Sequence, residues 1–370
     1  MRNTKADKSS GNLGQMLDRV WEDSPLTELD VVAGIGGTCV FRQSRSRNNN
    51  QEVTDTSRQF LVASLTKPVM ATLAMQYVCE GRIGLSDRVA DFLPAFRSGR
   101  FRRITIQHLL THTSGLPDML PENESLRAEH APLSEFVART SRVHPEFDVA
   151  TNTRYSSMGF AVLGQVLQQV GRAELHSLLT QTFLDPLQIR STWLGLPEDR
   201  PELLESVLQN ELPQWQPADA DWNWNSRYWR QLGAPWGGLI TTADDLAQLS
   251  MAILAPHTLG SSHPPINPLG VTNALQNQLQ NFPDIPESIR RCRSWGYGWR
   301  HNWPSHSACF CELLPSNAAG HWGATGTLWW LDPQSGRWAV LLSTTPYEVS
   351  RSTLQRISNV IAAALVDNVS

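Results

Sequence analysis

The sequence has almost no lysine. Only three of its 31 basic residues are lysines, and two of these, Lys5 and Lys8, lie close to the N-terminus. Lys67 is therefore the only lysine in the rest of a chain that otherwise uses arginine as its cation. Lysine differs from arginine mainly in that it can lose its proton near neutral pH when it is buried. Lys67 is thus a candidate for proton-transfer chemistry.

Three other features are missing. There is no run of basic residues and the formal net charge is −4, which argues against nucleic acid or an anionic membrane as a partner. No apolar stretch is long enough for a membrane span, and none follows the basic N-terminus as in a signal peptide. The five cysteines do not form a disulfide framework. We therefore expect a cytoplasmic protein with reduced thiols. The oligomeric state is not indicated.

The composition is that of a globular protein: the chain has 370 residues, of which 41% are hydrophobic and 18% charged. Strand patterns come first and last, with a mainly helical region between them, so we expect an α+β fold whose two ends share one antiparallel sheet. We expect a flexible tail over residues 1–12 and a single two-lobed domain over 13–370. Its sheet lobe should comprise about 13–80 and 290–370, and its mainly helical lobe about 81–289.

Local patterns predict several elements. An apolar, glycine-broken stretch predicts one strand over residues 31–41, and the sequence DPQSG at 332–336 predicts a hairpin turn. Residues 65–80 are apolar on nearly all sides, which predicts a buried helix that ends at Gly81. Apolar residues at helical spacing predict a final helix over 352–366.

Ser64 and Lys67 form a Ser-x-x-Lys motif at the start of the predicted buried helix. Residues three apart lie on one helix face, so the hydroxyl and the amine can come within hydrogen-bonding distance. The helix N-terminus adds free N–H groups and a positive dipole end beside Ser64. The structural alternative is a serine N-cap with an unrelated lysine. The position of this one lysine favours a nucleophile with its proton acceptor.

Two weaker motifs follow. Tyr155-Ser156-Ser157 stands just before an apolar helical stretch, and a phenol beside a lysine can share a proton. The sequence GHWGATGT at 320–327 leads into an apolar strand, and its glycines let another group approach the strand backbone. Taken alone, each motif has an ordinary structural explanation, as a loop tyrosine and as a bulged strand entry.

Two groups of residues have some resemblance to metal sites. His108 and His112 have helical metal spacing, but no glutamate follows His108. A second group falls within eleven residues, with a Cys-x-Cys spacing that is unusual for zinc: His301, His306, Cys309 and Cys311. We expect neither a metal nor a cofactor.

The Ser-x-x-Lys, Tyr-x-Ser and His-x-Gly motifs, in this order, resemble those of the serine β-lactamase and penicillin-binding-protein superfamily. The pattern is most similar to that of class C β-lactamase-like esterases, D-aminopeptidases and DD-peptidases. Two further segments resemble this branch: LLTHTSGLPD at 109–118 and GGLITTADDLA at 237–247. The resemblance covers roughly residues 20–366. It implies a β-lactamase/transpeptidase-like fold, with an antiparallel sheet flanked by helices and a mainly helical lobe.

The resemblance also implies roles for individual residues. Ser64 would be the acylated nucleophile, and Lys67 with Tyr155 the pair that moves its proton. The backbone N–H groups of Ser64 and Ala324 would form the oxyanion hole, in which one donor contributes about 10²–10³ in rate. Four positions would bind substrate: Ser157, where the family usually has asparagine, His321, where many members have lysine, and Trp322 and Gly323.

We therefore expect a serine hydrolase that cleaves a small ester, amide or peptide-like substrate through an acyl-enzyme. His321 and Trp322 are poorer partners for a substrate carboxylate than the Lys-Thr pair of β-lactam-hydrolysing relatives, because neither carries a charge at pH 7. This favours an esterase over a β-lactamase, DD-peptidase or D-aminopeptidase. A non-catalytic relative that binds acyl ligands is a further alternative, against which the intact Ser64, Lys67 and Tyr155 argue.

Overall fold

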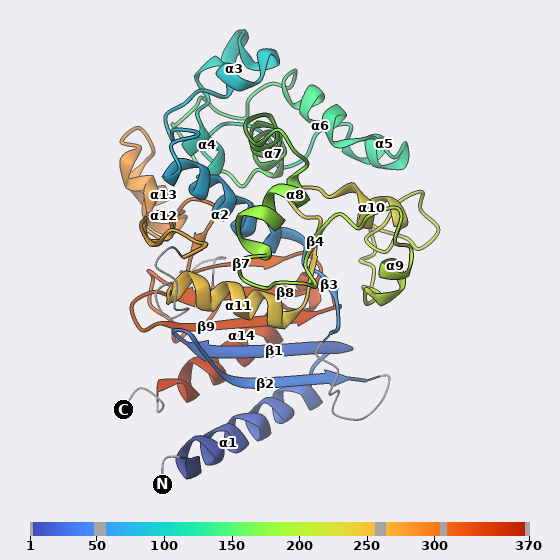
Figure 1. The fold of residues 1–370 in the computed structure, drawn as a ribbon, viewed down its shortest axis with the longest axis vertical. Coiled ribbons are helices and arrows are strands. Elements are labelled where there is room, and N and C mark those ends of the chain that lie inside the picture. The colour runs from blue at the N-terminus through green and yellow to red at the C-terminus, as the bar shows by residue number, and fades with distance from the viewer. Residues whose placement is uncertain (1–2, 48–56, 256–263, 304–308, 367–370) are drawn as a thin grey trace.

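A six-stranded antiparallel sheet joins the two ends of the chain. The computed structural model describes residues 3–47, 57–255, 264–303 and 309–366. The strand order is β2-β1-β9-β8-β7-β6 (Figure 1). The strands are β1 (Glu28–Ile35), β2 (Thr38–Ser46), β6 (Arg300–His301), β7 (Ala319–Gly323), β8 (Thr327–Asp332) and β9 (Arg337–Ser343). Because β1 pairs with β9, the predicted sharing of one sheet by the first and last segments is confirmed.

Two hairpins of this sheet, β8–β9 and β1–β2, turn at glycines with positive φ. The predicted turn between β8 and β9 is present, with Gly336 at φ 74°. The predicted single strand over residues 31–41 is wrong, because the chain reverses at Gly36, whose φ is 54°, and forms the two paired strands β1 and β2. Glycine adopts this left-handed conformation without the steric cost of a Cβ atom, so an apolar stretch that contains it can form a hairpin.

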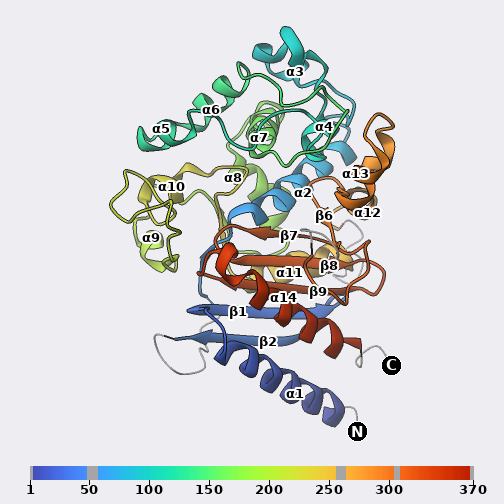
Figure 2. The ribbon, with the colours of Figure 1, turned by 180° about the vertical axis from the view of Figure 1, so that it is seen from behind.

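Helices cover both faces of the sheet. Helix α11 (Ala243–Leu254) lies on one face and α14 (Tyr347–Ala364) on the other, as Figures 1 and 2 show from opposite sides. Two consecutive tryptophans of β8 point to these two helices. The Trp329 indole N–H donates to Ser250 Oγ of α11 at 2.8 Å, and the Trp330 indole N–H donates to Ser358 Oγ of α14 at 3.2 Å. The alternation of strand side chains thus ties the sheet to one helix on each side.

Helix α1 (Asn3–Glu22) packs beside α14 and begins within residues 1–12, the segment for which a flexible tail is predicted. Leu13 and Leu17 are 4% and 2% exposed and belong to the apolar cluster between the sheet and α14. This packing fixes the last turns of the helix. Extending a helix that is already nucleated costs little, so the polar residues before Leu13 continue it.

The remaining helices lie mostly beside the sheet. They are α2 (Thr66–Cys79), α3 (Val89–Phe92), α4 (Ile106–Leu110), α5 (Asn123–Ala128), α6 (Leu133–Thr140), α7 (Ser157–Gly171), α8 (Leu175–Leu179), α9 (Glu202–Ser206), α10 (Arg227–Leu232), α12 (Pro268–Ala274) and α13 (Glu287–Cys292). A small second sheet has the order β3-β5-β4, from β3 (Phe60–Leu61), β4 (Trp193–Leu194) and β5 (Leu239–Thr241). Helix α11 comes from the segment assigned to the helical lobe, yet it contacts β1 and β9. The division into two lobes at the expected sequence positions stays a prediction.

Among the helices of the described ranges, none combines the length and the apolar character that crossing a lipid bilayer requires.

The packing of α1 can be tested by shortening Leu17. We expect Leu17→Ala to lower the free energy of unfolding by about 2–4 kcal/mol, because it leaves a cavity in the cluster beneath α14. The neighbouring residue Met16 is 41% exposed, so Met16→Ala should change it by no more than about 0.5 kcal/mol. Urea denaturation of both variants measures the difference. Equal stability of the two variants would show that α1 does not pack as described.

Candidate active site

Ser64 lies in a tight turn at the start of a buried helix. The turn is the 3₁₀ helix Ala63–Leu65, which leads directly into α2. Ala63 has φ 45°, a conformation that residues with a side chain rarely adopt. Ser64 itself stays partly exposed, whereas the first twelve residues of α2 are buried. The strained turn thus presents the Ser64 hydroxyl at the edge of an otherwise closed core.

Lys67 and Tyr155 both reach the Ser64 hydroxyl. Lys67 Nζ lies 3.2 Å from Ser64 Oγ, and the Tyr155 hydroxyl donates to Ser64 Oγ at 2.7 Å. Lys67 Nζ also lies 4.5 Å from the centre of the Tyr155 ring. Tyr155 comes from the loop just before α7, so residues about ninety positions apart in the sequence meet here. The three residues predicted to carry out the chemistry are therefore brought together.

Lys67 is fully buried and has no carboxylate partner within 4.0 Å among the described residues. Its ammonium donates to the carbonyl oxygen of Trp236 at 2.7 Å, in addition to its contact with Ser64. Burial lowers the pKa of Lys67 to about 7, and the negative charge of Asp118 opposes that shift. Burial thus brings the loss of the Lys67 proton into the neutral pH range. Burial and the Asp118 charge act on Tyr155 in the same direction and raise its pKa, so the phenol keeps its proton.

The turn between β7 and β8 is fixed against the turn that carries Ser64. Thr325 Oγ1 donates to the Leu61 carbonyl at 2.7 Å, and Thr327 Oγ1 donates to the Val62 carbonyl at 3.0 Å. A Cβ atom at Gly323 would lie 2.3 Å from the Val62 carbonyl oxygen, so only glycine permits this approach. Outside the helices and strands, the backbone N–H groups of Ser64 and Ala324 make no hydrogen bond among the described residues. Their role as an oxyanion hole stays a prediction.

His321 is buried on β7, with its ring 5.6 Å from that of Tyr155. Its Nδ1 lies 2.7 Å from the Trp322 carbonyl oxygen, which can only accept, so Nδ1 carries the proton. Nε2 is then a free acceptor, without a partner among the described residues. Burial, together with the Lys67 charge, lowers the pKa of His321 to about 3. His321 is therefore neutral at physiological pH.

Trp322 and Ser157, also predicted to bind substrate, both have structural contacts. Trp322 stacks on Tyr347 with 5.5 Å between ring centres and an angle of 8°. Ser157 is the first residue of α7, and its backbone N–H donates to Asp118 Oδ1 at 3.0 Å. Within the described residues, the Ser157 side chain makes no hydrogen bond to Ser64 or Lys67. Its assignment as a substrate ligand remains a prediction.

Sequence reasoning gave no role to Asp118 and Arg300. Asp118 ends the LLTHTSGLPD segment, and its charge acts on both Lys67 and Tyr155. The Arg300 guanidinium stacks over the rings of Trp322 at 4.7 Å and Trp295 at 5.4 Å, and its charge acts on Tyr155 and His321. It has no carboxylate partner within 4.0 Å among the described residues, and its Nε is buried without an acceptor. Asp118 could have been found from its place in the LLTHTSGLPD segment. Nothing in the sequence distinguishes Arg300 from the other arginines.

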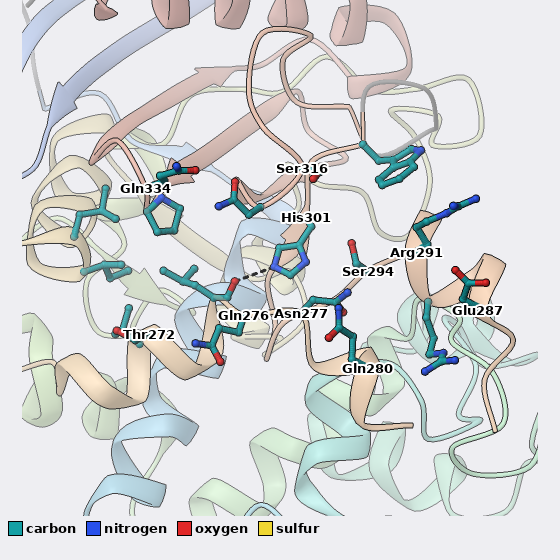
Figure 3. Close-up of a pocket in the computed structure, with 18 residues that line it drawn as sticks. Thr272, Gln276, Asn277, Gln280, Glu287, Arg291, Ser294, His301, Ser316 and Gln334 are labelled. Atoms are coloured by element: carbon teal, nitrogen blue, oxygen red, sulfur yellow. Dashed lines mark hydrogen bonds between the residues drawn. The ribbon is translucent and has the colours of Figure 1, made fainter. Parts of the chain in front are cut away.

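A separate cavity of about 1080 Å³ lies between α12, α13 and β6, and its lining includes neither Ser64, Lys67 nor Tyr155 (Figure 3). His301 projects into it and bonds through Nε2 to the Leu275 carbonyl oxygen at 2.9 Å. In the described part of the chain, no three His, Cys, Asp or Glu residues are arranged to hold a metal ion. His306, one of the residues with metal-like spacing, lies outside the described residues.

A turn that carries Ser64 and leads into a buried helix beside an antiparallel sheet is the layout expected from the β-lactamase resemblance, and comparison with known proteins agrees on the family. The chain belongs to the Beta-lactamase family, whose model matches residues 30–363. Esterase EstB of Burkholderia gladioli is 24% identical over 383 aligned residues, which cover 92% of each chain. A β-lactamase of Pseudomonas fluorescens is 26% identical over 200 residues; these are 52% of this chain and only 54% of that protein.

Solved structures confirm the predicted fold. A penicillin-binding-protein homolog from Caulobacter crescentus superposes with a TM-score of 0.78 at 20% identity, over 96% of this chain and 97% of that one. The hydrolase EstCE1, described as having promiscuous acyltransferase activity, superposes with a TM-score of 0.76 at 18% identity, over 98% of this chain and 100% of that one. The predicted superfamily and the α+β fold class are thus correct.

Proposed function

We propose that the protein is a serine hydrolase that forms an acyl-enzyme on Ser64. The observation that carries this proposal is the convergence of Lys67 Nζ and the Tyr155 hydroxyl on Ser64 Oγ. The esterase and β-lactamase names of its relatives support the same class. The intact set argues against the alternative of a non-catalytic protein that only binds acyl ligands.

The pKa shifts of Lys67 and Tyr155 indicate which of the two accepts a proton and which donates one. Neutral Lys67 accepts the Ser64 proton as Oγ attacks the substrate carbonyl, while the N–H groups of Ser64 and Ala324 bind the developing oxyanion. Tyr155 keeps its proton at neutral pH, so it serves as the acid that protonates the leaving group, and the Lys67 ammonium returns a proton to it. Water then attacks the acyl-enzyme. One of its protons stays on the acid product and the other restores the Ser64 hydroxyl.

The nucleophile is tested by covalent labelling. We expect a fluorophosphonate to add once to the wild-type chain and not at all to Ser64→Ala, because Ser64 is the group activated by Lys67. Intact-mass spectrometry measures both. Ser156→Ala is the matched control, since this neighbouring serine caps α7 by accepting from the Gly159 N–H at 2.9 Å and should leave labelling intact. Labelling that persists in Ser64→Ala would place the nucleophile elsewhere.

The base is tested by pH dependence. If neutral Lys67 is required, kcat/KM for a neutral aryl ester should rise with pH to a plateau, with a midpoint near the Lys67 pKa of about 7. Lys67→Arg should fold but lose most activity at every accessible pH, because a guanidinium stays protonated. Stopped-flow or steady-state rates between pH 5 and 9 give the profile. A Lys67→Arg enzyme with near-wild-type turnover contradicts the assignment of Lys67 as base.

For the substrate class we keep an esterase as the first proposal, because neutral His321 offers no charge to a carboxylate. Arg300 favours a second candidate, a β-lactamase or a peptidase acting on carboxylate-bearing substrates, including DD-peptides. An arginine with no acidic partner beside the site is a suitable carboxylate ligand.

We also propose a cytoplasmic location, because the five free cysteines are typical of a reducing compartment.

Removal of the Arg300 charge separates the two candidates. Arg300→Met keeps an apolar stem between Trp295 and Trp322, so we expect kcat/KM for an uncharged aryl ester to change less than threefold. If Arg300 binds carboxylate, kcat/KM for a carboxylate-bearing twin of that ester should fall by about 10–100-fold, the value of a charge-assisted hydrogen bond. Equal effects on both twins would exclude Arg300 as a carboxylate ligand and leave the esterase.

A further inference from the structure

His112 holds the backbone of the segment that carries Tyr155 on both sides of that residue. The His112 carbonyl oxygen accepts the Arg154 N–H at 3.0 Å. Its Nδ1 accepts the Ser156 N–H at 3.1 Å. One residue therefore binds the N–H groups immediately before and after Tyr155, which fixes the position and direction of that part of the loop.

The His112 ring also packs against the Tyr155 side chain. The two ring centres lie 4.9 Å apart with an angle of 40°. On its other sides the imidazole contacts Phe160 at 5.5 Å and meets Trp295 edge-on at 4.3 Å. The phenol is thus supported from behind by a ring that is itself held among aromatic side chains.

The hydrogen bonds fix the state of the imidazole. Because Nδ1 accepts a backbone N–H, the proton of neutral His112 is on Nε2, which is buried and has no acceptor among the described residues. His112 is 1% exposed, and burial together with nearby Lys67, His321 and Arg300 lowers its pKa well below the ordinary value. The ring therefore stays neutral, and Nδ1 stays an acceptor.

His112 lies outside direct reach of the Ser64 hydroxyl, whose side-chain contacts among the described residues are Lys67 and Tyr155. We propose that His112 is the positioning residue of Tyr155: its carbonyl, its Nδ1 and its ring together hold the phenol at hydrogen-bonding distance from Ser64. This inference rests on the proposed role of Tyr155 in the hydrolase mechanism. A displacement of about 1 Å at a reacting group costs on the order of 10²-fold in rate.

Two variants separate the hydrogen bond from the ring packing. His112→Phe keeps an aromatic ring but leaves the Ser156 N–H without its acceptor. His112→Asn provides an amide oxygen for that N–H but loses the ring contacts; His112 has φ 58°, and asparagine tolerates this left-handed conformation. His108→Phe is the matched control, because His108 Nδ1 likewise accepts a backbone N–H, that of Thr105 at 3.1 Å, and its ring packs on Phe282.

The experiment measures kcat and KM for a neutral alkyl ester, whose alkoxide leaving group needs the Tyr155 proton, with the full-length protein, in variants whose folding is verified by circular dichroism and thermal melting. We expect kcat to fall by the order of 10²-fold in His112→Phe and less in His112→Asn, with KM nearly unchanged in both and His108→Phe close to wild type. The double variant His112→Phe, Tyr155→Phe should be about as slow as Tyr155→Phe alone, because His112 acts through the phenol.

A merely structural role predicts a different result. The loss in His112→Phe would then multiply with that of Tyr155→Phe, and this outcome overturns the inference, as do His112 variants with wild-type kcat. Failure of the underlying mechanism is distinguishable: a Tyr155→Phe enzyme with full activity overturns the proposed role of Tyr155 itself. A slow Tyr155→Phe enzyme together with fast His112 variants overturns only the positioning role.

Discussion

The site depends on the burial of one amine. Lys67 is removed from water among the Tyr155 and Phe160 rings, with the Trp236 carbonyl and the Ser64 hydroxyl as its polar partners. A pKa that falls from 10.5 to about 7 means that the folded protein binds this proton less tightly than the unfolded chain, by on the order of 5 kcal/mol. The cost to stability is complete below about pH 7 and disappears above pH 10.5, where both states are neutral. An arginine here would bear its charge at every accessible pH.

The rest of the structure holds the partners of this amine in place. The carbonyl of Trp236 precedes β5, and the Leu239 N–H of that strand donates to Thr66 Oγ1 at 3.0 Å in the first turn of α2. The turn between β7 and β8 is bonded to Leu61 and Val62 on the other side of the Ser64 turn. Two segments that are far apart in the sequence thus converge on one short turn. The large sheet and its helices provide the rigid support that this convergence requires.

Much of this arrangement could be predicted from local sequence. The buried helix, the β8–β9 hairpin and the Ser-x-x-Lys motif each depend on residues close together in the chain, and the structure contains all three. The extent of α1 and the charges around the site depend on distant contacts instead. Nothing near Arg300 in the sequence indicates that it will stack between Trp295 and Trp322. Asp118 belonged to a segment noted for its resemblance, but its effect on Lys67 follows only from the folded geometry.

Burial also explains how Lys67 can act as a proton acceptor without a charged residue on β7. No neighbouring cation is needed to make Lys67 neutral, since burial lowers its pKa while the Asp118 charge acts in the opposite direction. A buried, neutral His321 adds no positive charge beside the amine. The capacity of Lys67 to accept a proton therefore depends on the exclusion of water by the rings around it. Under the proposed mechanism, the aromatic side chains packed against Tyr155 and Lys67, including that of His112, therefore serve proton transfer as well as the hydrophobic core.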